Sequence, residues 1–224
     1  MRIGLLSGTF NPIHNGHLQI AGEVYQRLRL DTVLFIPSGI PPHKSDRNIP
    51  HGKYRMEMAA LALSDTSHFK LCDLEAHRPG KSYSIDTVRA LKKRFTNDRL
   101  FFILGMDAFL DIANWRESEC LLTLCDFVVI SRPGYPFSRL PDIAVLRSVD
   151  LAPFSQLDKG DRRSYTFPVS NESAFHFIRV RPSEISASDI RSRFAARRET
   201  RNLLPEPVES YIIRKRIYVE DNDF

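Results

Sequence analysis

The sequence predicts an α/β protein with a Rossmann-like, doubly wound parallel sheet, and three observations support that prediction. Short apolar runs alternate with amphipathic stretches, an order typical of parallel strands joined by right-handed helical crossovers. Residues 100–104 are apolar throughout, as expected for a central strand covered on both faces. Residues 3–6 form a short apolar run that a helical pattern follows, so the chain opens with a strand–turn–helix unit.

Strands and helices can be assigned in order from this alternation. The candidate strands are the apolar runs at 2–6, 32–36, 69–71, 100–104, 127–130 and 175–180. The helical patterns between them lie near 17–28, 52–64, 84–95 and 117–124. In the first helix the apolar side chains recur at intervals of three and four residues, at Leu18, Ala21, Val24, Tyr25 and Leu28.

The second half of the chain ends in a helical part at about 183–218. Prolines and a glycine punctuate residues 133–175, where we expect loops, a short helix and room for one strand. Ser186 or Ser188 can then cap a helix that runs to about residue 198, and a last helix begins at Pro205 and the proline two residues later. A chain of 224 residues suits one domain over 1–224, with roughly 70% of the unfolded surface buried.

Composition and charge indicate a cytoplasmic protein without a nucleic-acid-binding pattern or a membrane span. The net charge is +5, and much of the basic excess lies in seven arginines between 179 and 201. These arginines suit a solvated helix face or the attraction of polyphosphates, whereas no aromatic-interleaved or helix-turn-helix pattern favours nucleic acid. Three cysteines without a C-x-x-C pair indicate reduced thiols in a cytoplasmic protein. We expect no leader peptide and no membrane span, and self-association stays open.

The most informative segment is residues 7–17, which read SGTFNPIHNGH. It lies on the turn between the first strand and the first helix, where backbone N–H groups and the helix dipole can receive a phosphate. Two imidazoles, His14 and His17, can donate hydrogen bonds to charge that builds up on a phosphoryl group. A helix start without a ligand is the alternative. The pairing of the histidines with Gly16 and the Gly-Thr-Phe turn favours the phosphate site.

This turn resembles the signature (G/S)GTFDPxHxGH of the nucleotidyltransferases related by fold to class I aminoacyl-tRNA synthetases. Further stretches resemble motifs of the bacterial nicotinate-mononucleotide adenylyltransferases: PPHK at 41–44, SYS at 82–84, FILGMD at 102–107 with Trp115, and ISASDIR at 185–191. The resemblance covers nearly the whole chain. It implies adenylyl transfer from ATP to nicotinate mononucleotide, giving deamido-NAD and pyrophosphate in NAD biosynthesis.

The resemblance also implies residues for ATP. Catalytic roles fall to His14, His17, Lys44 and Arg191. The ATP site would comprise Gly8, Thr9, Phe10, His17, Gly105, Asp107, Ser186, Ser188 and Arg191. Of these, Gly8, Thr9 and Phe10 would offer backbone N–H groups, and Asp107 would accept from ribose hydroxyls. Non-functional interpretations of these residues stay open. Lys44 would look the same in the sequence as an exposed loop lysine, and Ser186, Ser188 and Asp107 would look the same as ordinary helix caps.

The acceptor site implied by the resemblance comprises Thr9, Lys44, Tyr83, Ser84, Trp115 and Arg132. Trp115 would stack on the pyridine ring, although a lone tryptophan also suits a protein core. Backbone N–H groups at Tyr83 and Ser84, at a helix start, would meet the pyridine carboxylate. No motif indicates a protein-bound metal. We expect Mg²⁺ to be carried in by ATP, bound mainly by its phosphates and by water.

Two other functions stay open at this point. Another enzyme of the superfamily, such as a pantetheine-phosphate adenylyltransferase or a cytidylyltransferase, would share the histidine turn, and so would a nucleotide-binding regulator without catalysis. Three residues depart from the usual family pattern: Ser7 replaces a glycine, Asn11 an aspartate and Ser84 a threonine. None of these changes removes a group that the implied chemistry needs.

Overall fold

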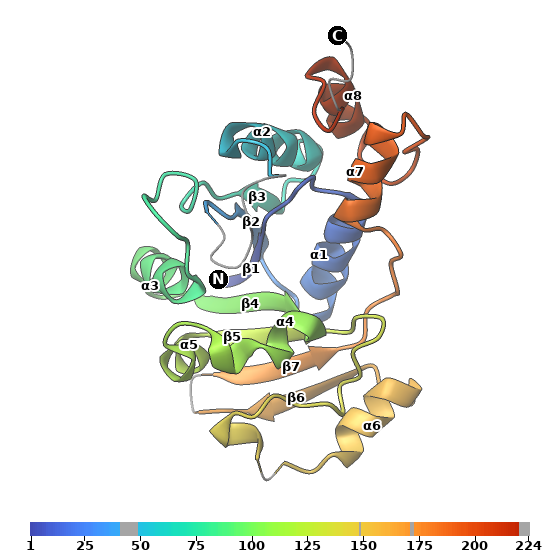
Figure 1. The fold of residues 1–224 in the computed structure, drawn as a ribbon. Helices are drawn as coiled ribbons and strands as arrows, with labels where there is room; N and C mark the ends of the chain where they lie inside the picture. Colours follow the sequence, from blue (N-terminus) through green and yellow to red (C-terminus); the bar gives the residue numbers. More distant parts are fainter. Residues whose placement is uncertain (41–48, 148, 171–172, 220–224) are drawn as a thin grey trace. The chain divides into compact units, whose positions relative to one another are not determined.

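The computed structural model describes residues 1–40, 49–147, 149–170 and 173–219 (Figure 1). Seven strands form one sheet in the order β3-β2-β1-β4-β5-β7-β6. They are β1 (Arg2–Gly8), β2 (Thr32–Pro37), β3 (Phe69–Leu71), β4 (Arg99–Gly105), β5 (Asp126–Ile130), β6 (Ser164–Pro168) and β7 (Ala174–Ile178). The pairs β1–β4, β4–β5 and β5–β7 are parallel. The predicted α/β, mostly parallel sheet is therefore confirmed.

Helices alternate with the strands as the sequence predicts. They are α1 (Asn15–Arg27), α2 (Gly52–Leu63), α3 (Ser84–Arg94), α4 (Met106–Leu110), α5 (Ser118–Leu124), α6 (Ala152–Lys159), α7 (Ala187–Ala195) and α8 (Glu206–Arg214), with 3-10 turns η2 (Ile112–Asn114) and η3 (Ala144–Leu146). The C-terminal helical part is confirmed, with Ser186 as the N-cap of α7. Among the described helices, none combines the length and apolar character that crossing a bilayer requires.

Two details differ from the sequence prediction. The strand expected within 133–175 is β6, and it pairs antiparallel with β7 rather than parallel. Only residues 169–173 separate the two strands in the sequence, which is too short for the crossover that a parallel pair needs. The α4–η2 segment after β4 was not predicted, because its two pieces of five and three residues are too short to establish a helical period.

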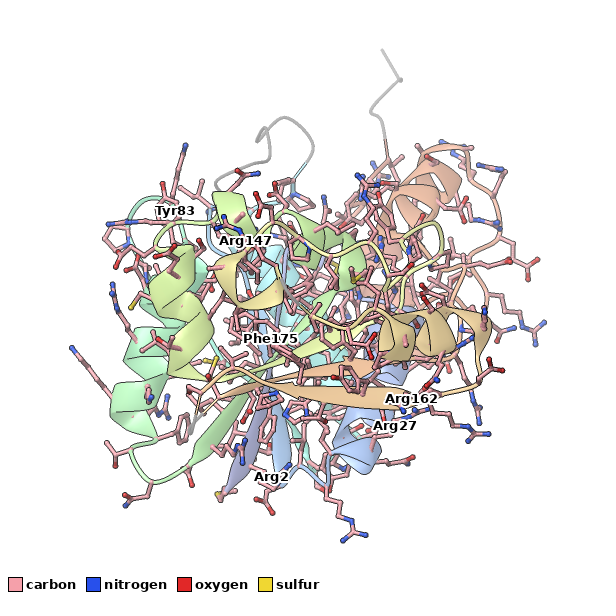
Figure 2. All side chains as sticks on the ribbon, turned by 90° about the horizontal axis from the view of Figure 1, so that it is seen from below. Arg2, Arg27, Tyr83, Arg147, Arg162 and Phe175 are labelled. Atoms are coloured by element: carbon pink, nitrogen blue, oxygen red, sulfur yellow. The ribbon has the colours of Figure 1, made fainter. Side chains whose placement is uncertain are left out.

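The chain forms two compact units, each assembled from three segments. The first unit comprises Met1–Leu6, Glu23–Val33 and Tyr83–Pro182, and the second comprises Ser7–Gly22, Leu34–Ser82 and Ser183–Phe224. In the first unit, aromatic rings fill the space over β5 and β7: Phe109, Phe127 and Phe154 all pack against Phe175 or Phe177. Phe175 is fully buried, whereas Arg27 at the end of α1 is exposed; both are labelled in Figure 2.

A buried carboxylate, that of Asp126, is fixed at the start of β5 in the first unit. Its side chain is fully buried and accepts from Arg99, with Nη2 at 2.9 Å, from the backbone N–H of Ala174 at 3.0 Å and from His176 Nε2 at 3.3 Å. Burial alone would raise the pKa of Asp126, but the hydrogen bonds from His176 and Arg99 outweigh it and lower the pKa. The network ties β4, β5 and β7 together at one end of the sheet.

We predict that Asp126→Asn lowers the free energy of unfolding by about 1–3 kcal/mol, because buried donors lose a charged acceptor. The folded-state pKa lies below the ordinary value of about 3.9, so this contribution is complete above about pH 4 and is lost as the pH falls through the folded-state value. Urea unfolding between pH 3 and pH 8, on both proteins, measures it.

The matched control is Asp142→Asn, which breaks an exposed ion pair with Arg147 whose atoms lie 3.0 Å apart. Exposed pairs contribute about 0–1 kcal/mol, so this variant should unfold nearly as the parent does. An Asp126→Asn protein as stable as the parent at neutral pH would show that the network contributes nothing.

Candidate active site

The signature loop between β1 and α1 belongs to the second unit and is shaped by Phe10. Phe10 has a φ of 45°, in the left-handed region that non-glycine residues rarely adopt, and its side chain is 2% exposed. Its ring lies 5.9 Å from that of Phe35 on β2 and meets the ring of His17 edge-on at 5.0 Å. The buried aromatic side chain therefore holds the turn and supports one face of His17.

The two signature histidines are stacked on each other. Their ring centroids are 3.7 Å apart with an interplanar angle of 27°, and His14 is 7% exposed. The backbone N–H of His14 donates to Nδ1 of His17 at 3.2 Å. Because Nδ1 accepts, the proton of the neutral His17 ring lies on Nε2, at the far side of the ring. His17 thus presents a fixed N–H donor.

Gly16, between the histidines, is required by close approach. A Cβ at this position would lie 2.9 Å from Ser183 Oγ and 3.1 Å from His14 Nδ1. Both distances are shorter than ordinary van der Waals contacts, so any side chain would displace the His14 ring. Gly16 therefore allows the histidine pair to stack.

A buried arginine that the sequence analysis did not identify holds this loop. Arg55 on α2 is 3% exposed, and its guanidinium donates to the carbonyls of Ser38 at 2.7 Å, Thr9 at 2.9 Å, Gly39 at 3.0 Å and Pro50 at 3.3 Å. Burial lowers the pKa of Arg55, and the Tyr218 and Glu75 side chains offset part of that effect. One cation thus joins the loops that follow β1 and β2.

The sequence does contain a signal for Arg55. The buried side of α2 consists of Arg55, Met58, Ala59 and Leu63, which recur at helical intervals of three and four residues. An arginine on the apolar face of a helix is rarely buried without dedicated partners. The position could therefore have been singled out, whereas the loop carbonyls that it contacts could not.

The predicted phosphate residues of the C-terminal part also lie in the second unit. Ser186 caps α7, with its Oγ accepting from Asp189 N–H at 3.1 Å. Arg191 donates to Ser188 Oγ at 3.1 Å and to the backbone carbonyl of Asn11 at 2.9 Å. The structure therefore brings Arg191 to the signature loop from a position 180 residues away in the sequence.

A cavity of about 820 Å³ opens in the second unit. Its lining includes residues 37–40 at and after the end of β2, residues 49–53 at the start of α2, and Arg55, which also donates to the carbonyl of Thr9 in the signature loop. Residues 40 and 49 flank the PPHK segment, but Lys44 itself lies outside the described residues. The cavity lies at the carboxyl end of β2, which is where ligands bind in sheets of this type.

In the first unit, two predicted site residues form an ion pair. Arg132 Nε lies 3.0 Å from Asp107 Oδ2, with the two side chains 55% and 33% exposed. The Asp107 carboxylate folds back over Gly105, so a Cβ at Gly105 would collide with it. A side chain at this position would require the Asp107 carboxylate to move, and the end of β4 presents a carboxylate and a guanidinium together.

The predicted acceptor residues Tyr83, Ser84 and Trp115 are also in the first unit. Tyr83 is the N-cap residue of α3, and no side chain caps this helix start. The guanidinium of Arg116 lies over the Tyr83 ring, 4.9 Å from its centroid. Trp115 is half-buried and meets Phe102 edge-on at 6.2 Å, which leaves part of the indole accessible.

The structure thus resolves the predicted site into two groups. The second unit holds Gly8, Thr9, Phe10, His14, His17, Ser186, Ser188 and Arg191, and the first holds Gly105, Asp107, Tyr83, Ser84, Trp115 and Arg132. In the second unit Arg191 contacts the signature loop, and in the first unit Asp107 pairs with Arg132. That both groups act on one pair of substrates stays a prediction.

Comparisons with known proteins identify the family to which the chain belongs. Residues 5–193 match the Cytidylyltransferase-like family. A protein of Geobacter metallireducens named "Probable nicotinate-nucleotide adenylyltransferase" is 42% identical over 224 residues, with 99% of this chain and 100% of the relative covered. A protein of the same name from Geobacter sulfurreducens is 42% identical over 221 residues, which cover 99% of this chain and 100% of that relative.

Solved structures show the same fold. The Plasmodium falciparum nicotinic acid mononucleotide adenylyltransferase complexed with NaAD superposes with a TM-score of 0.72 at 19% identity, covering 97% of each chain. The same enzyme complexed with APC gives a TM-score of 0.70 at 18% identity, with 97% of this chain and 96% of that chain covered. Since the family match spans most of the sequence and the relatives match from end to end, the chain belongs to the cytidylyltransferase-like family and, within it, to the nicotinate-nucleotide adenylyltransferases.

Proposed function

We propose that this protein transfers the adenylyl group of ATP to nicotinate mononucleotide, giving deamido-NAD and pyrophosphate, a step of NAD biosynthesis. The observation that carries the proposal is the histidine pair. His17 Nδ1 accepts from the backbone at 3.2 Å, which places the proton of the neutral ring on Nε2, at the end of a strand and the start of a helix. Membership of the nicotinate-nucleotide adenylyltransferases supports the choice of substrates.

The proposed reaction is a single in-line displacement at the α-phosphorus of ATP. A phosphate oxygen of nicotinate mononucleotide forms the new P–O bond, the bond to the β-phosphate oxygen breaks, and pyrophosphate leaves with the electron pair. Such a reaction needs positioning and stabilisation of charge rather than covalent participation by the protein. In this proposal His17 Nε2 donates to an α-phosphate oxygen, and His14 supports the neighbouring phosphates or the acceptor phosphate.

The remaining groups of the second unit would hold the polyphosphate. Backbone N–H groups of Gly8, Thr9 and Phe10 would face the phosphates. Arg55 donates to the Thr9 carbonyl at 2.9 Å, so the Phe10 N–H of the same peptide points away from Arg55. The first-turn N–H groups of α7 at Ser186 and Ser188 would receive the β- and γ-phosphates. Arg191 would add a charge-assisted bond from the donors that its contact with Asn11 leaves.

Mg²⁺ is proposed to enter with ATP and to be held mainly by phosphate oxygens and water. Within the part of the chain that the structure describes, no group of three histidine, cysteine or acidic side chains is arranged to hold a metal. Phosphate oxygens and water would supply the ligands of this ion. When bound, it would neutralise charge on the leaving pyrophosphate.

The first unit would supply the ribose and acceptor contacts. Asp107 would accept from ribose hydroxyls, and its partner Arg132, 3.0 Å away, would turn to the acceptor phosphate together with Lys44. Backbone N–H groups at Tyr83 and Ser84 would bind the pyridine carboxylate, and the accessible face of Trp115 would stack on the ring. We also propose a cytoplasmic location, which the three free cysteines support.

The first prediction of this proposal concerns His17. His17→Ala should lower kcat by about 10²–10³-fold with little change in KM, the scale for losing one preorganised donor to a transition-state oxygen. His17→Gln, which can place an N–H near the position of Nε2, should retain more activity. His68→Ala, in the same unit, is the matched control. Near-normal kcat in His17→Ala would rule out this role.

The second prediction concerns Arg55. Arg55→Lys should lower kcat several-fold and the free energy of unfolding by about 1–3 kcal/mol, because one ammonium cannot satisfy four buried carbonyls. Steady-state kinetics and thermal unfolding measure the two effects. Arg89→Lys, at an exposed ion pair with Glu117, is the control and should change neither. If Arg55→Lys is less stable but keeps the kcat of the parent, Arg55 stabilises the protein without positioning the signature loop for catalysis.

The third prediction concerns substrates, measured as pyrophosphate release from each NTP with a panel of acceptors. ATP with nicotinate mononucleotide should be the preferred pair. The amide mononucleotide should be poorer in kcat/KM by on the order of 10²-fold or more, because an amide would turn an NH₂ toward the backbone donors at the start of α3.

Two outcomes of the panel would contradict the proposal at different levels. Equal efficiency on the acid and amide mononucleotides would overturn the carboxylate site while leaving adenylyl transfer intact. Preference for CTP, or for a pantetheine phosphate as acceptor, would assign the chain to another activity of the superfamily.

A further inference from the structure

The hydroxyl of Tyr218 contacts the signature loop, although 207 residues separate the two in the sequence. Tyr218 OH donates to Asn11 Oδ1 at 2.7 Å. Asn11 is 8% exposed and follows Phe10 directly, so the bond acts on the buried side of the loop. Neither the signature pattern nor the C-terminal sequence predicts this contact.

Asn11 is held from a second direction as well. Its backbone carbonyl accepts from Arg191 Nη1 at 2.9 Å, while its side chain accepts from Tyr218. The residue before it, Phe10, supports the ring of His17 edge-on at 5.0 Å. A displacement of Asn11 would therefore reach His17 through one intervening side chain.

Tyr218 is itself fixed in place. Its φ is 69°, which ends the helical turn after α8, and its ring lies 6.2 Å from that of Phe194 on α7. The preceding residue, Ile217, is buried and donates its N–H to the carbonyl of Ile212 at 3.0 Å. Burial raises the pKa of Tyr218 despite the opposing charges of Arg191 and Arg55, so the phenol stays protonated and donates at neutral pH.

We propose that Tyr218 is a positioning residue for adenylyl transfer, which holds Asn11 and thereby the signature loop in the conformation that presents His17. The expected effect on kcat rests on the proposed function. The expected effect on the conformation of the loop does not. Tyr218 does not need to touch either substrate. Its effect should appear in kcat, because the loop geometry governs the transition state more than ground-state binding.

The variant that tests the inference is Tyr218→Phe, which removes one hydroxyl and keeps the ring against Phe194. We expect kcat to fall by about three- to tenfold, the fold-change that one neutral hydrogen bond corresponds to, with KM for ATP unchanged. The matched control is Tyr211→Phe. It removes another hydroxyl of the C-terminal part, which donates to Glu57 on α2 and not to the loop, and it should leave kcat unchanged.

A double-mutant cycle with Asn11→Ala separates this role from a general loss of stability. If Tyr218 acts through Asn11, Tyr218→Phe should lower kcat in the parent and have almost no further effect in the Asn11→Ala background. An equal loss of kcat in both backgrounds would overturn the inference, and so would a Tyr218→Phe protein with the kcat of the parent.

Hydrogen exchange of the loop amides provides a readout that does not depend on activity. In Tyr218→Phe the amides of residues 9–11, 13 and 14 should exchange faster by about three- to tenfold, with no such change in Tyr211→Phe. If the parent transfers no adenylyl group to nicotinate mononucleotide, the proposed function fails and exchange alone decides the inference. Unchanged exchange of these amides in Tyr218→Phe would contradict it.

Discussion

The conformation of the signature loop depends on one buried cation, the guanidinium of Arg55. An arginine that is 3% exposed loses nearly all its hydration, and this cost is offset only where its N–H groups find acceptors. Here the acceptors are four backbone carbonyls from the segments that follow β1 and β2. Because the carbonyls point at Arg55, the peptide N–H groups of those segments must point elsewhere. The same hydrogen bonds therefore stabilise the buried charge of Arg55 and fix the conformation of the loop.

The same constraint explains why the loop can carry strain. Phe10 adopts a left-handed φ of 45°, a conformation that costs of order 1–3 kcal/mol and persists only when the surroundings fix it. Arg55 before the strained residue and Arg191 after it hold the adjoining carbonyls. The result is an imidazole whose position, face and tautomer are all fixed before substrate arrives. For a displacement at phosphorus, such preorganisation is the main contribution that a protein can make.

Much of the fold could be predicted from the sequence, because parallel strands with both faces buried are continuous apolar runs. All six predicted strands are present, and the helices at 84–94 and 118–124 begin within a residue of the predicted positions. The antiparallel β6 was not identified as such, because its direction follows from the length of its turn and not from its own residues. Residues 106–114 form helices too short to show a period.

The histidine pair of the candidate site could be predicted, because its motif is recognisable in the sequence and lies between a predicted strand and a predicted helix. The residues that hold the histidine loop in place were harder to predict. Arg55 leaves a signal as a charge on the apolar face of α2, but Tyr218 leaves none, since a hydrogen bond across 207 residues has no local pattern. The pairing of Asp107 with Arg132 was likewise hidden, although each residue was assigned to the site separately.

In the proposed reaction His17 Nε2 donates to the α-phosphate of ATP while nicotinate mononucleotide is bound in line with it. The decisive experiment is a crystal structure of the protein with an unreactive ATP analogue and nicotinate mononucleotide. We expect an Nε2 to α-phosphate oxygen distance of about 2.7–3.2 Å. We also expect that His17 Nδ1 still accepts from His14 N–H and that Arg55 still donates to the loop carbonyls. An α-phosphate bound away from the signature loop, or a His17 ring turned so that Nδ1 faces the phosphate, would contradict it.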